Sequence, residues 1–135
     1  MSWDGYIDSV LGGAKGHADK ACIIGLNGGP WTTSAHASNI NLQGTEAQTI
    51  AAALNSGDYT TFQSGGIIIE GQKYRFLRGD AEEGLVLGKL KENGAITIQK
   101  SETAVVIGHT AEGKQQGETN TGVKGIVDYL KGMNM

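Results

Sequence analysis

The chain has 135 residues, of which 39% are hydrophobic and 19% charged, so a disordered chain and a pair of ordinary cores are both excluded and one domain over residues 1–135 is expected. The formal net charge of −3 excludes the overall basic character typical of nucleic-acid binding. Residues 1–72 carry two basic and six acidic side chains, whereas residues 73–135 carry nine and eight, so most positive charge lies in the second half.

The first predicted element is an amphipathic helix near the N-terminus. Ser2 is suited to cap it, and Gly12-Gly13 to end it. Its apolar side chains follow the i, i+3, i+4, i+7, i+8 spacing of one helical stripe: Trp3, Tyr6, Ile7, Val10 and Leu11.

A hairpin and a second helix are predicted next. Residues 20–26 have the composition of a short buried strand, and residues 31–35 are expected to pair with it after a turn at residues 27–30. Residues 44–54 contain good helix formers with an acidic first turn, and residues 55–57 should end that helix.

The second half predicts an antiparallel meander closed by a helix. Asn93-Gly94 is a strong hairpin signal between two of its strands, which we expect at residues 67–70, 73–78, 85–87, 95–98 and 104–107. A final helical stripe, preceded by the capping candidates Thr119, Asn120 and Thr121, consists of Val123, Ile126, Val127 and Leu130. The predicted fold class is therefore α+β, with a central antiparallel sheet that carries the terminal helices together on one face and shorter helical segments on the other.

The compartment is predicted from the single cysteine and from the N-terminus. Cys22 lies alone in an apolar run, so it cannot form an intramolecular disulfide and is expected to be a buried, reduced thiol. The first residues lack a basic region followed by an apolar one, and no stretch reaches the length of a membrane span. We expect a cytoplasmic protein.

Aromatic placement is the most informative feature for function. Of eight aromatic residues, both tryptophans fall within the first 31 positions, and Trp3 and Tyr6 share a helical stripe. Tyr129 lies at the edge of the C-terminal stripe, so the rings converge if the terminal helices pack side by side. Such a platform suits polyproline II peptides, which are stiff and offer flat rings and free carbonyls. Periodicity alone, however, favours Trp3 and Tyr6 as core residues, because stripes at helical spacing usually pack into the core.

Several segments together resemble the profilin family. They are Met1–Asp8, Ile24–Ser34, Gly88-Lys89, Gly94–Ile98 and Gly125–Lys131, and their order and spacing span almost the whole chain. The resemblance implies a protein that binds monomeric actin and the proline-rich segments of assembly factors such as formins. It further implies a place in the actin cytoskeleton, control of filament assembly and faster actin nucleotide exchange, with no cofactor and no enzymatic activity.

The resemblance also implies which residues bind each partner. Trp3, Tyr6, Trp31 and Tyr129 correspond to the polyproline groove, and Met135 stands where some relatives have an aromatic residue. The actin-facing positions are Lys73, Arg75, Phe76, Arg78, Lys89, Lys91, Thr97, Gln99, Asn120 and Lys124. Because side chains alternate along a strand, Phe76 and Arg78 share a face with Arg75 only if the strand twists or bulges. Ordinary solvated strand faces remain the alternative for each of these residues.

Phosphoinositide head groups are a further partner implied by the resemblance. The tightest basic run is Lys73–Arg78, with Lys89 and Lys91 expected nearby. Because Asp80, Glu82 and Glu83 follow closely, weak binding at best is expected.

Two other classes of function are weaker alternatives. A sensor domain of the PAS type has a similar size and an antiparallel sheet, but would enclose a small ligand. A nucleotide-handling enzyme would rest on Gly108–Lys114, which begins like a phosphate-binding loop but has Gln115 in place of Ser/Thr, followed by a segment we do not expect to be helical. The three histidines, at positions 17, 36 and 109, lack metal-ligand spacing, so we expect surface or locally bonded side chains and no metal site.

Overall fold

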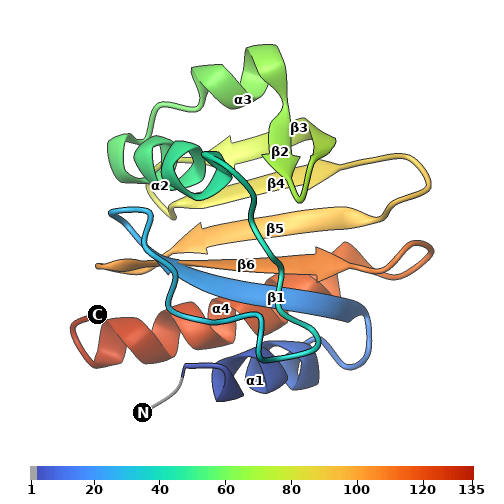
Figure 1. Ribbon diagram of the computed structural model, residues 1–135, viewed down its shortest axis with the longest axis vertical. Helices are drawn as coiled ribbons and strands as arrows, with labels where there is room; N and C mark the ends of the chain where they lie inside the picture. Colours follow the sequence, from blue (N-terminus) through green and yellow to red (C-terminus); the bar gives the residue numbers. More distant parts are fainter. Residues whose placement is uncertain (1–2) are drawn as a thin grey trace.

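The computed structural model describes residues 3–135 and has one sheet with helices on both faces (Figure 1). The strand order is β1-β6-β5-β4-β3-β2, and every neighbouring pair is antiparallel. The elements are α1 (Gly5–Gly13), β1 (Ala18–Gly25), α2 (Glu46–Ser56), α3 (Thr60–Gly65), β2 (Ile67–Ile69), β3 (Gln72–Asp80), β4 (Leu85–Lys89), β5 (Ala95–Lys100), β6 (Ala104–Thr110) and α4 (Gln116–Gly132). The predicted fold class is confirmed, although the short helix α3 had not been predicted.

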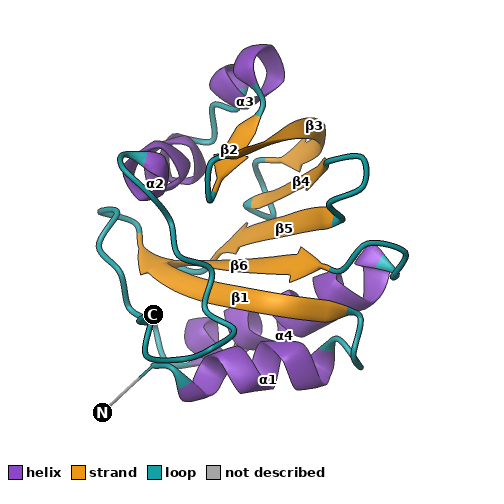
Figure 2. Ribbon diagram, turned by 45° about the vertical axis from the view of Figure 1, so that its right-hand side comes forward, coloured by secondary structure: helices purple, strands orange, loops and turns teal. Residues whose placement is uncertain are grey.

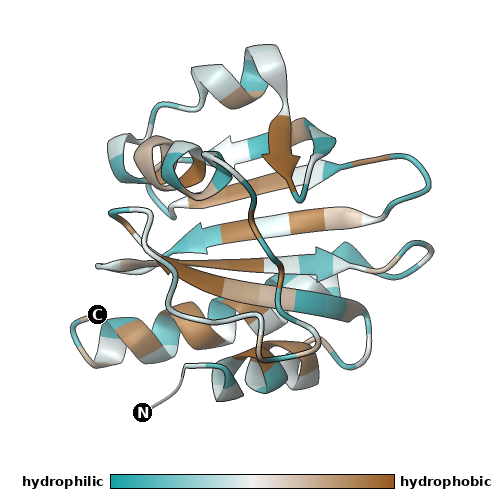
Figure 3. Ribbon diagram, in the orientation of Figure 1, coloured by the Kyte–Doolittle hydropathy of each residue, from teal (hydrophilic) through white to brown (hydrophobic). Residues whose placement is uncertain are grey.

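Strand alternation divides the core between the two faces of the sheet. On β6, Val105 and Ile107 face the cluster formed with α2 and α3, whereas Ala104 and Val106 face the cluster formed with α1 and α4. All four side chains are buried, which explains why the sequence of β6 begins with a continuous apolar run (Figure 3). Cys22 belongs to the first cluster as a free thiol, and burial raises its pKa, so it remains protonated as expected.

Glycine allows α1 and α4 to pack closely against each other and the sheet. A Cβ atom on Gly122 would lie 2.4 Å from the Val10 carbonyl oxygen and 2.9 Å from the Ala14 nitrogen. One on Gly13 would lie 3.0 Å from the Gly122 Cα. The two helix backbones are therefore in direct contact, which sets the distance between side chains on their outer faces.

The last helix begins earlier than predicted. It starts at Gln116, so Thr119–Thr121 lie inside the helix and are not caps. The prediction failed because the first turn carries no apolar stripe. Its polar side chains bond to the sheet instead: Gln116 Nε2 donates to the Ile96 carbonyl oxygen at 2.8 Å, and Thr110 Oγ1 donates to Thr119 Oγ1 at 2.6 Å.

The predicted strand at residues 31–35 is wrong, because this segment belongs to a loop over residues 26–45 (Figure 2). Strand-like contacts of this loop, within the described residues, are two isolated bridges, Pro30 with Ile24 and Asn39 with Ala21, and neither involves residues 31–35. Thr32 prevents a ladder: its hydroxyl accepts the Ile23 N–H, while the Trp31 and Thr32 N–H groups both donate to the Ile23 carbonyl oxygen. Pro30, which has no N–H, cannot extend the pairing.

The meander in the second half is confirmed, including the hairpin at Asn93-Gly94. Gly94 has φ +78°, and a Cβ atom on it would lie 1.9 Å from the Thr110 carbonyl oxygen, so only glycine fits. Ser2 lies outside the described residues, and the position before α1 is taken by Asp4. Within residues 3–135, none of the helices combines the length and apolar character needed to cross a bilayer.

Candidate functional site

Four aromatic rings from three separate segments meet beside the terminal helices. We call Trp3, Tyr6, Trp31 and Tyr129 the aromatic cluster. The Trp3 ring centroid lies 5.1 Å from that of Tyr6 and 4.7 Å from that of Trp31, and the Tyr6 and Tyr129 centroids are 5.8 Å apart. These separations are within the range of direct aromatic contact.

One side of the aromatic cluster packs on the core, and the other side is open to solvent. Trp3, Tyr6 and Trp31 pack partly against the apolar residues between α1, α4 and the sheet, and Tyr129 is 51% exposed. Met135 packs against the same apolar residues, and its carbonyl oxygen accepts hydrogen bonds from the Ser101 and Thr103 hydroxyls at 2.7 and 2.8 Å. The rings therefore satisfy both sequence interpretations, because one side contacts the core and the other forms a surface.

A side-chain hydrogen bond joins the two tyrosines of the aromatic cluster. A side-chain hydrogen bond with Tyr129 is the main cause that raises the pKa of the Tyr6 hydroxyl, because it stabilises the neutral phenol. Because the pKa of Tyr6 is raised in the folded state, the hydrogen bond stabilises the folded protein at neutral pH. That stabilisation is lost as the pH rises through the Tyr6 titration.

Tyr129→Phe should therefore lower the Tyr6 pKa toward the ordinary tyrosine value of about 10. A pH titration of tyrosinate absorbance, with Tyr6→Phe to identify the Tyr6 signal, measures this shift. A Tyr6 titration that is unchanged by Tyr129→Phe would contradict the link.

A second candidate surface lies on β3 and β4, on the same face of the sheet as α4. The helix covers this face as far as β5 and leaves β3 and β4 uncovered. A β-bulge between Phe76 and Arg78 shifts the register of β3, so that Arg75 pairs with Lys89 and Arg78 pairs with Leu87. Directly paired residues share a face, and Lys89 and Leu87 are two positions apart on β4. The bulge thus places Arg78 on the same face as Arg75, which simple alternation forbids. We call Lys73, Arg75, Arg78, Lys89 and Lys91 the basic face.

The other predicted actin-facing residues occupy different environments. Phe76 is on the opposite side of β3 and packs partly on the core, 6.4 Å from the Tyr59 ring centroid. Thr97 is buried and donates a hydrogen bond to Asn120 of α4, which joins the helix to the sheet beside the basic face.

Gln99 and Lys124, which were also predicted to face actin, differ in exposure. Gln99 is buried and makes a long hydrogen bond, 3.5 Å, to the Glu83 carbonyl oxygen. Lys124 is exposed one turn beyond Asn120 and forms a 2.8 Å ion pair with Asp128. Asn120 and Lys124 therefore lie on α4 at the border of the basic face, whereas Phe76 is separated from it by the sheet.

A hollow of about 420 Å³ lies within the basic face. It is lined by Lys73, Arg75, Leu77, Lys89, Leu90, Lys91 and Glu112. Sequence reasoning had not assigned Leu77 and Leu90 a role. Leu77, at the bulge, is 43% exposed, and its place within the basic run Lys73–Arg78 was the available sequence signal.

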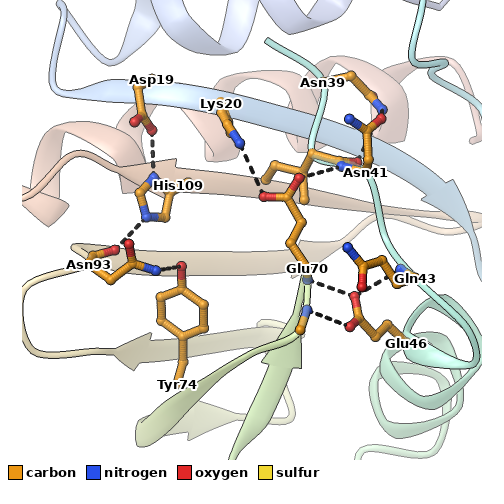
Figure 4. A network of polar contacts seen from close by, with 12 residues as sticks. Asp19, Lys20, Asn39, Asn41, Gln43, Glu46, Glu70, Tyr74, Asn93 and His109 are labelled. Carbon is orange, nitrogen blue, oxygen red and sulfur yellow. Dashed lines mark hydrogen bonds and ion pairs between the residues drawn. The ribbon is translucent and has the colours of Figure 1, made fainter.

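Polar contacts hold the loop and the hairpins that carry these surfaces (Figure 4). The Glu46 carboxylate accepts the Glu70 and Gly71 N–H groups at 2.7 and 2.8 Å, which attaches the β2–β3 turn to the start of α2. Glu70 in turn accepts the Asn41 N–H at 2.9 Å and pairs with Lys20 at 3.3 Å. The loop over residues 26–45 is thereby joined to the hairpin that begins the basic face.

The three histidines are locally bonded, as expected. His17 Nδ1 accepts the Gln115 N–H at 3.0 Å, and His36 Nε2 lies 2.9 Å from Asp8. His109 contacts Asp19 at 2.5 Å and the Asn93 carbonyl oxygen at 2.7 Å. Among residues 3–135, no three His, Cys, Asp or Glu side chains gather in a manner suited to a metal ion.

The phosphate-loop resemblance of Gly108–Lys114 also has a structural outcome. A helix does follow the segment, because α4 starts at Gln116, so our expectation of a non-helical continuation was wrong. However, Gly108 lies inside β6, where a Cβ atom would contact Val123 and Thr119 of α4 at 2.8 and 2.9 Å. Glu112, within the same segment, uses its carboxylate to accept the Gly94 N–H at 2.8 Å.

Comparison with known proteins gives one consistent result. A model of the family described as Profilin matches residues 1–135. Profilin of Heliocidaris crassispina is 52% identical, and profilin of Suberites domuncula 51% identical, over 142 residues that cover 100% of this chain and of each relative. The crystal structure of profilin II from Acanthamoeba castellanii is 30% identical with a TM-score of 0.83, covering 99% of this chain and all of that one.

Two solved complexes share the fold at lower identity. Mouse profilin IIa in complex with a double repeat from the FH1 domain of mDia1 is 16% identical, with a TM-score of 0.74 and full coverage of both chains. A LokiProfilin1–rabbit actin complex is 20% identical, with a TM-score of 0.67, covering 96% of this chain and 93% of that one. On the evidence of the matched family model and the close relatives, the chain belongs to the profilin family.

Proposed function

We propose that the chain binds proline-rich peptide segments on the aromatic cluster. The convergence of four rings from residues 3–6, α4 and the loop over residues 26–45 is the observation that carries this proposal. Open ring faces match the flat ridges of a polyproline II helix, and the indole N–H and phenol O–H groups can donate to its free carbonyls. The mouse profilin IIa complex with a double repeat from the FH1 domain of mDia1 supports a partner of this kind for the fold.

Titration with a proline decamer, followed by tryptophan fluorescence, tests this function directly. Both tryptophans belong to the aromatic cluster, so the decamer should change the emission in a saturable manner. An emission spectrum that stays constant at high decamer concentration would overturn the proposal.

The chain also binds monomeric actin through the basic face and the adjoining part of α4. Cationic side chains surround the apolar Leu77 and Leu90 in the same hollow, an arrangement suited to an acidic protein partner. The LokiProfilin1–actin complex supports a partner of this kind for the fold.

Lys89→Glu should weaken actin binding by about tenfold, since it reverses a charge between Arg75 and Lys91. The measurement is the inhibition of pyrene-actin assembly at several concentrations of protein. Lys131→Glu, the same charge change on the last turn of α4, is the matched control and should inhibit assembly like the wild type. If Lys89→Glu inhibits assembly as strongly as the wild type, the basic face is not part of the actin-binding site.

Regulation of assembly and nucleotide exchange follows from unequal binding to the conformations of actin. A protein that prefers an open actin state speeds nucleotide release without making or breaking bonds. The chain accordingly acts as a binding protein and not as an enzyme, in the cytoplasm with the actin cytoskeleton. A PAS-type sensor function is not supported, because the family match covers the whole chain.

Phosphoinositide binding is the third part of the proposal. Four cations line the hollow in the basic face, with Glu112 as the single acidic residue among them. Binding should therefore be weak and reduced by salt. Sedimentation with vesicles that contain phosphatidylinositol bisphosphate, compared with phosphatidylcholine vesicles, tests it, and equal sedimentation with both would exclude it.

A further inference from the structure

Trp31 presents a structural problem, because it belongs to a loop and not to a strand. Hydrogen bonds of Trp31 and Thr32 with Ile23 attach this part of the loop to one edge of β1. The Trp31 ring must nevertheless be held 4.7 Å from Trp3, which precedes α1. Additional contacts between the loop and α1 are therefore needed to define that distance.

Two acidic side chains from the start of α1 provide these contacts. The two carboxylate oxygens of Asp4 accept the Thr33 N–H and the Thr33 hydroxyl, each at 2.7 Å. One turn later, Asp8 Oδ1 lies 2.9 Å from His36 Nε2. We call Asp4, Asp8, Thr33 and His36 the acidic latch.

The contacts of His36 determine which nitrogen carries the proton. Its Nδ1 accepts the Ser38 N–H at 3.0 Å, so in this geometry Nδ1 is unprotonated. The proton is consequently on Nε2, which donates to Asp8. Both ring nitrogens are used, and the His36 side chain is only 19% exposed, so the ring is a fixed point of the loop.

We propose that the acidic latch positions Trp31 for peptide binding, with Asp8 and His36 as positioning residues that do not touch the peptide. This inference rests on the proposed polyproline function. The tie to α1 fixes the separation of the Trp3 and Trp31 rings before the ligand arrives, which lowers the ordering cost of binding. Its removal should allow the loop to move away from α1 while the β1 contacts of Trp31 and Thr32 remain.

The test compares two substitutions at one position. Asp8→Ala removes the acceptor for His36 Nε2–H and should weaken proline-decamer binding by about three- to tenfold. Asp8→Asn keeps an oxygen in the same place and should bind like the wild type. Glu82→Ala, an exposed residue at the β3–β4 turn, makes the same charge change as Asp8→Ala and should leave binding unaltered.

Near-ultraviolet circular dichroism of the unliganded protein supplies a readout that does not depend on the ligand. The closely spaced Trp3 and Trp31 indoles should give a coupled signal, which Asp8→Ala reduces and Asp8→Asn preserves. Thr33→Val loses the hydroxyl bonds to Asp4 and to the Ala35 N–H but keeps the Thr33 N–H bond to Asp4, so it should produce a smaller change in the same direction.

The outcomes separate the latch from the proposed function. If Asp8→Ala matches the wild type in both decamer affinity and circular dichroism, or if Asp8→Asn is as impaired as Asp8→Ala, the latch is overturned. If the wild type fails to bind the decamer, the polyproline function fails, and the circular dichroism series still decides whether the latch positions Trp31.

Discussion

Trp3→Ala should reduce the affinity for a proline decamer by at least about thirtyfold, equivalent to about 2 kcal/mol. Trp3 is one of two inner rings, since it contacts both Tyr6 and Trp31, and its loss separates Trp31 from the two tyrosines. Trp31 remains as the fluorescent reporter, so the same titration can be used for the variant.

A control is needed because Trp3 also packs partly on the core. Thermal unfolding and far-ultraviolet circular dichroism should show that the variant stays folded. Ile68→Ala removes an apolar side chain that is 40% exposed on β2, and should bind the decamer normally. Affinity of folded Trp3→Ala within a factor of two or so of the wild type would show that the aromatic cluster is not the peptide site.

Gly122→Ala should destabilise the protein by about 1–3 kcal/mol, the usual range for overpacking. The added methyl would lie 2.4 Å from the Val10 carbonyl oxygen, and because this neighbour is helix backbone it cannot turn aside. The helices α1 and α4 must then separate, which also moves Tyr6 away from Tyr129. Urea denaturation measures the change in the free energy of unfolding.

Gly125→Ala on the same helix is a matched control of opposite sign. Gly125 is exposed, and a Cβ atom there would meet nothing within 4 Å. Replacing a helical glycine by alanine in open space should stabilise the protein by up to about 1 kcal/mol. Similar changes for the two variants would mean that close contact between α1 and α4 does not limit stability.

Hydrophobic periodicity was sufficient to predict most of the fold. The apolar runs of β1, β5 and β6 are buried on both faces of the sheet, and the stripe of α4 faces the core. The failures occurred where polar contacts decide the structure. Residues 31–35 follow a turn and include residue types favoured in strands, but the Thr32 hydroxyl occupies the Ile23 N–H that strand pairing would use.

The candidate sites show the same division. The spacing of Trp3 and Tyr6 predicted a shared helix face, but Trp3 precedes α1, and both rings pack partly on the core while they also form part of a surface. The bulge that aligns Arg78 with Arg75 depends on hydrogen bonds between β3 and β4, which no local pattern in residues 73–78 reveals. The tie between Asp8 and His36 joins residues 28 positions apart and had no sequence signal.

We expect the aromatic cluster and the basic face to bind a proline-rich peptide and monomeric actin at the same time. The anisotropy of a fluorescently labelled proline-rich peptide is followed as the protein is added, with and without saturating monomeric actin. Because the aromatic cluster and the basic face lie on different parts of the domain, the coupling free energy should be near zero and the peptide affinity the same in both series. Loss of peptide binding in the presence of actin would contradict the claim.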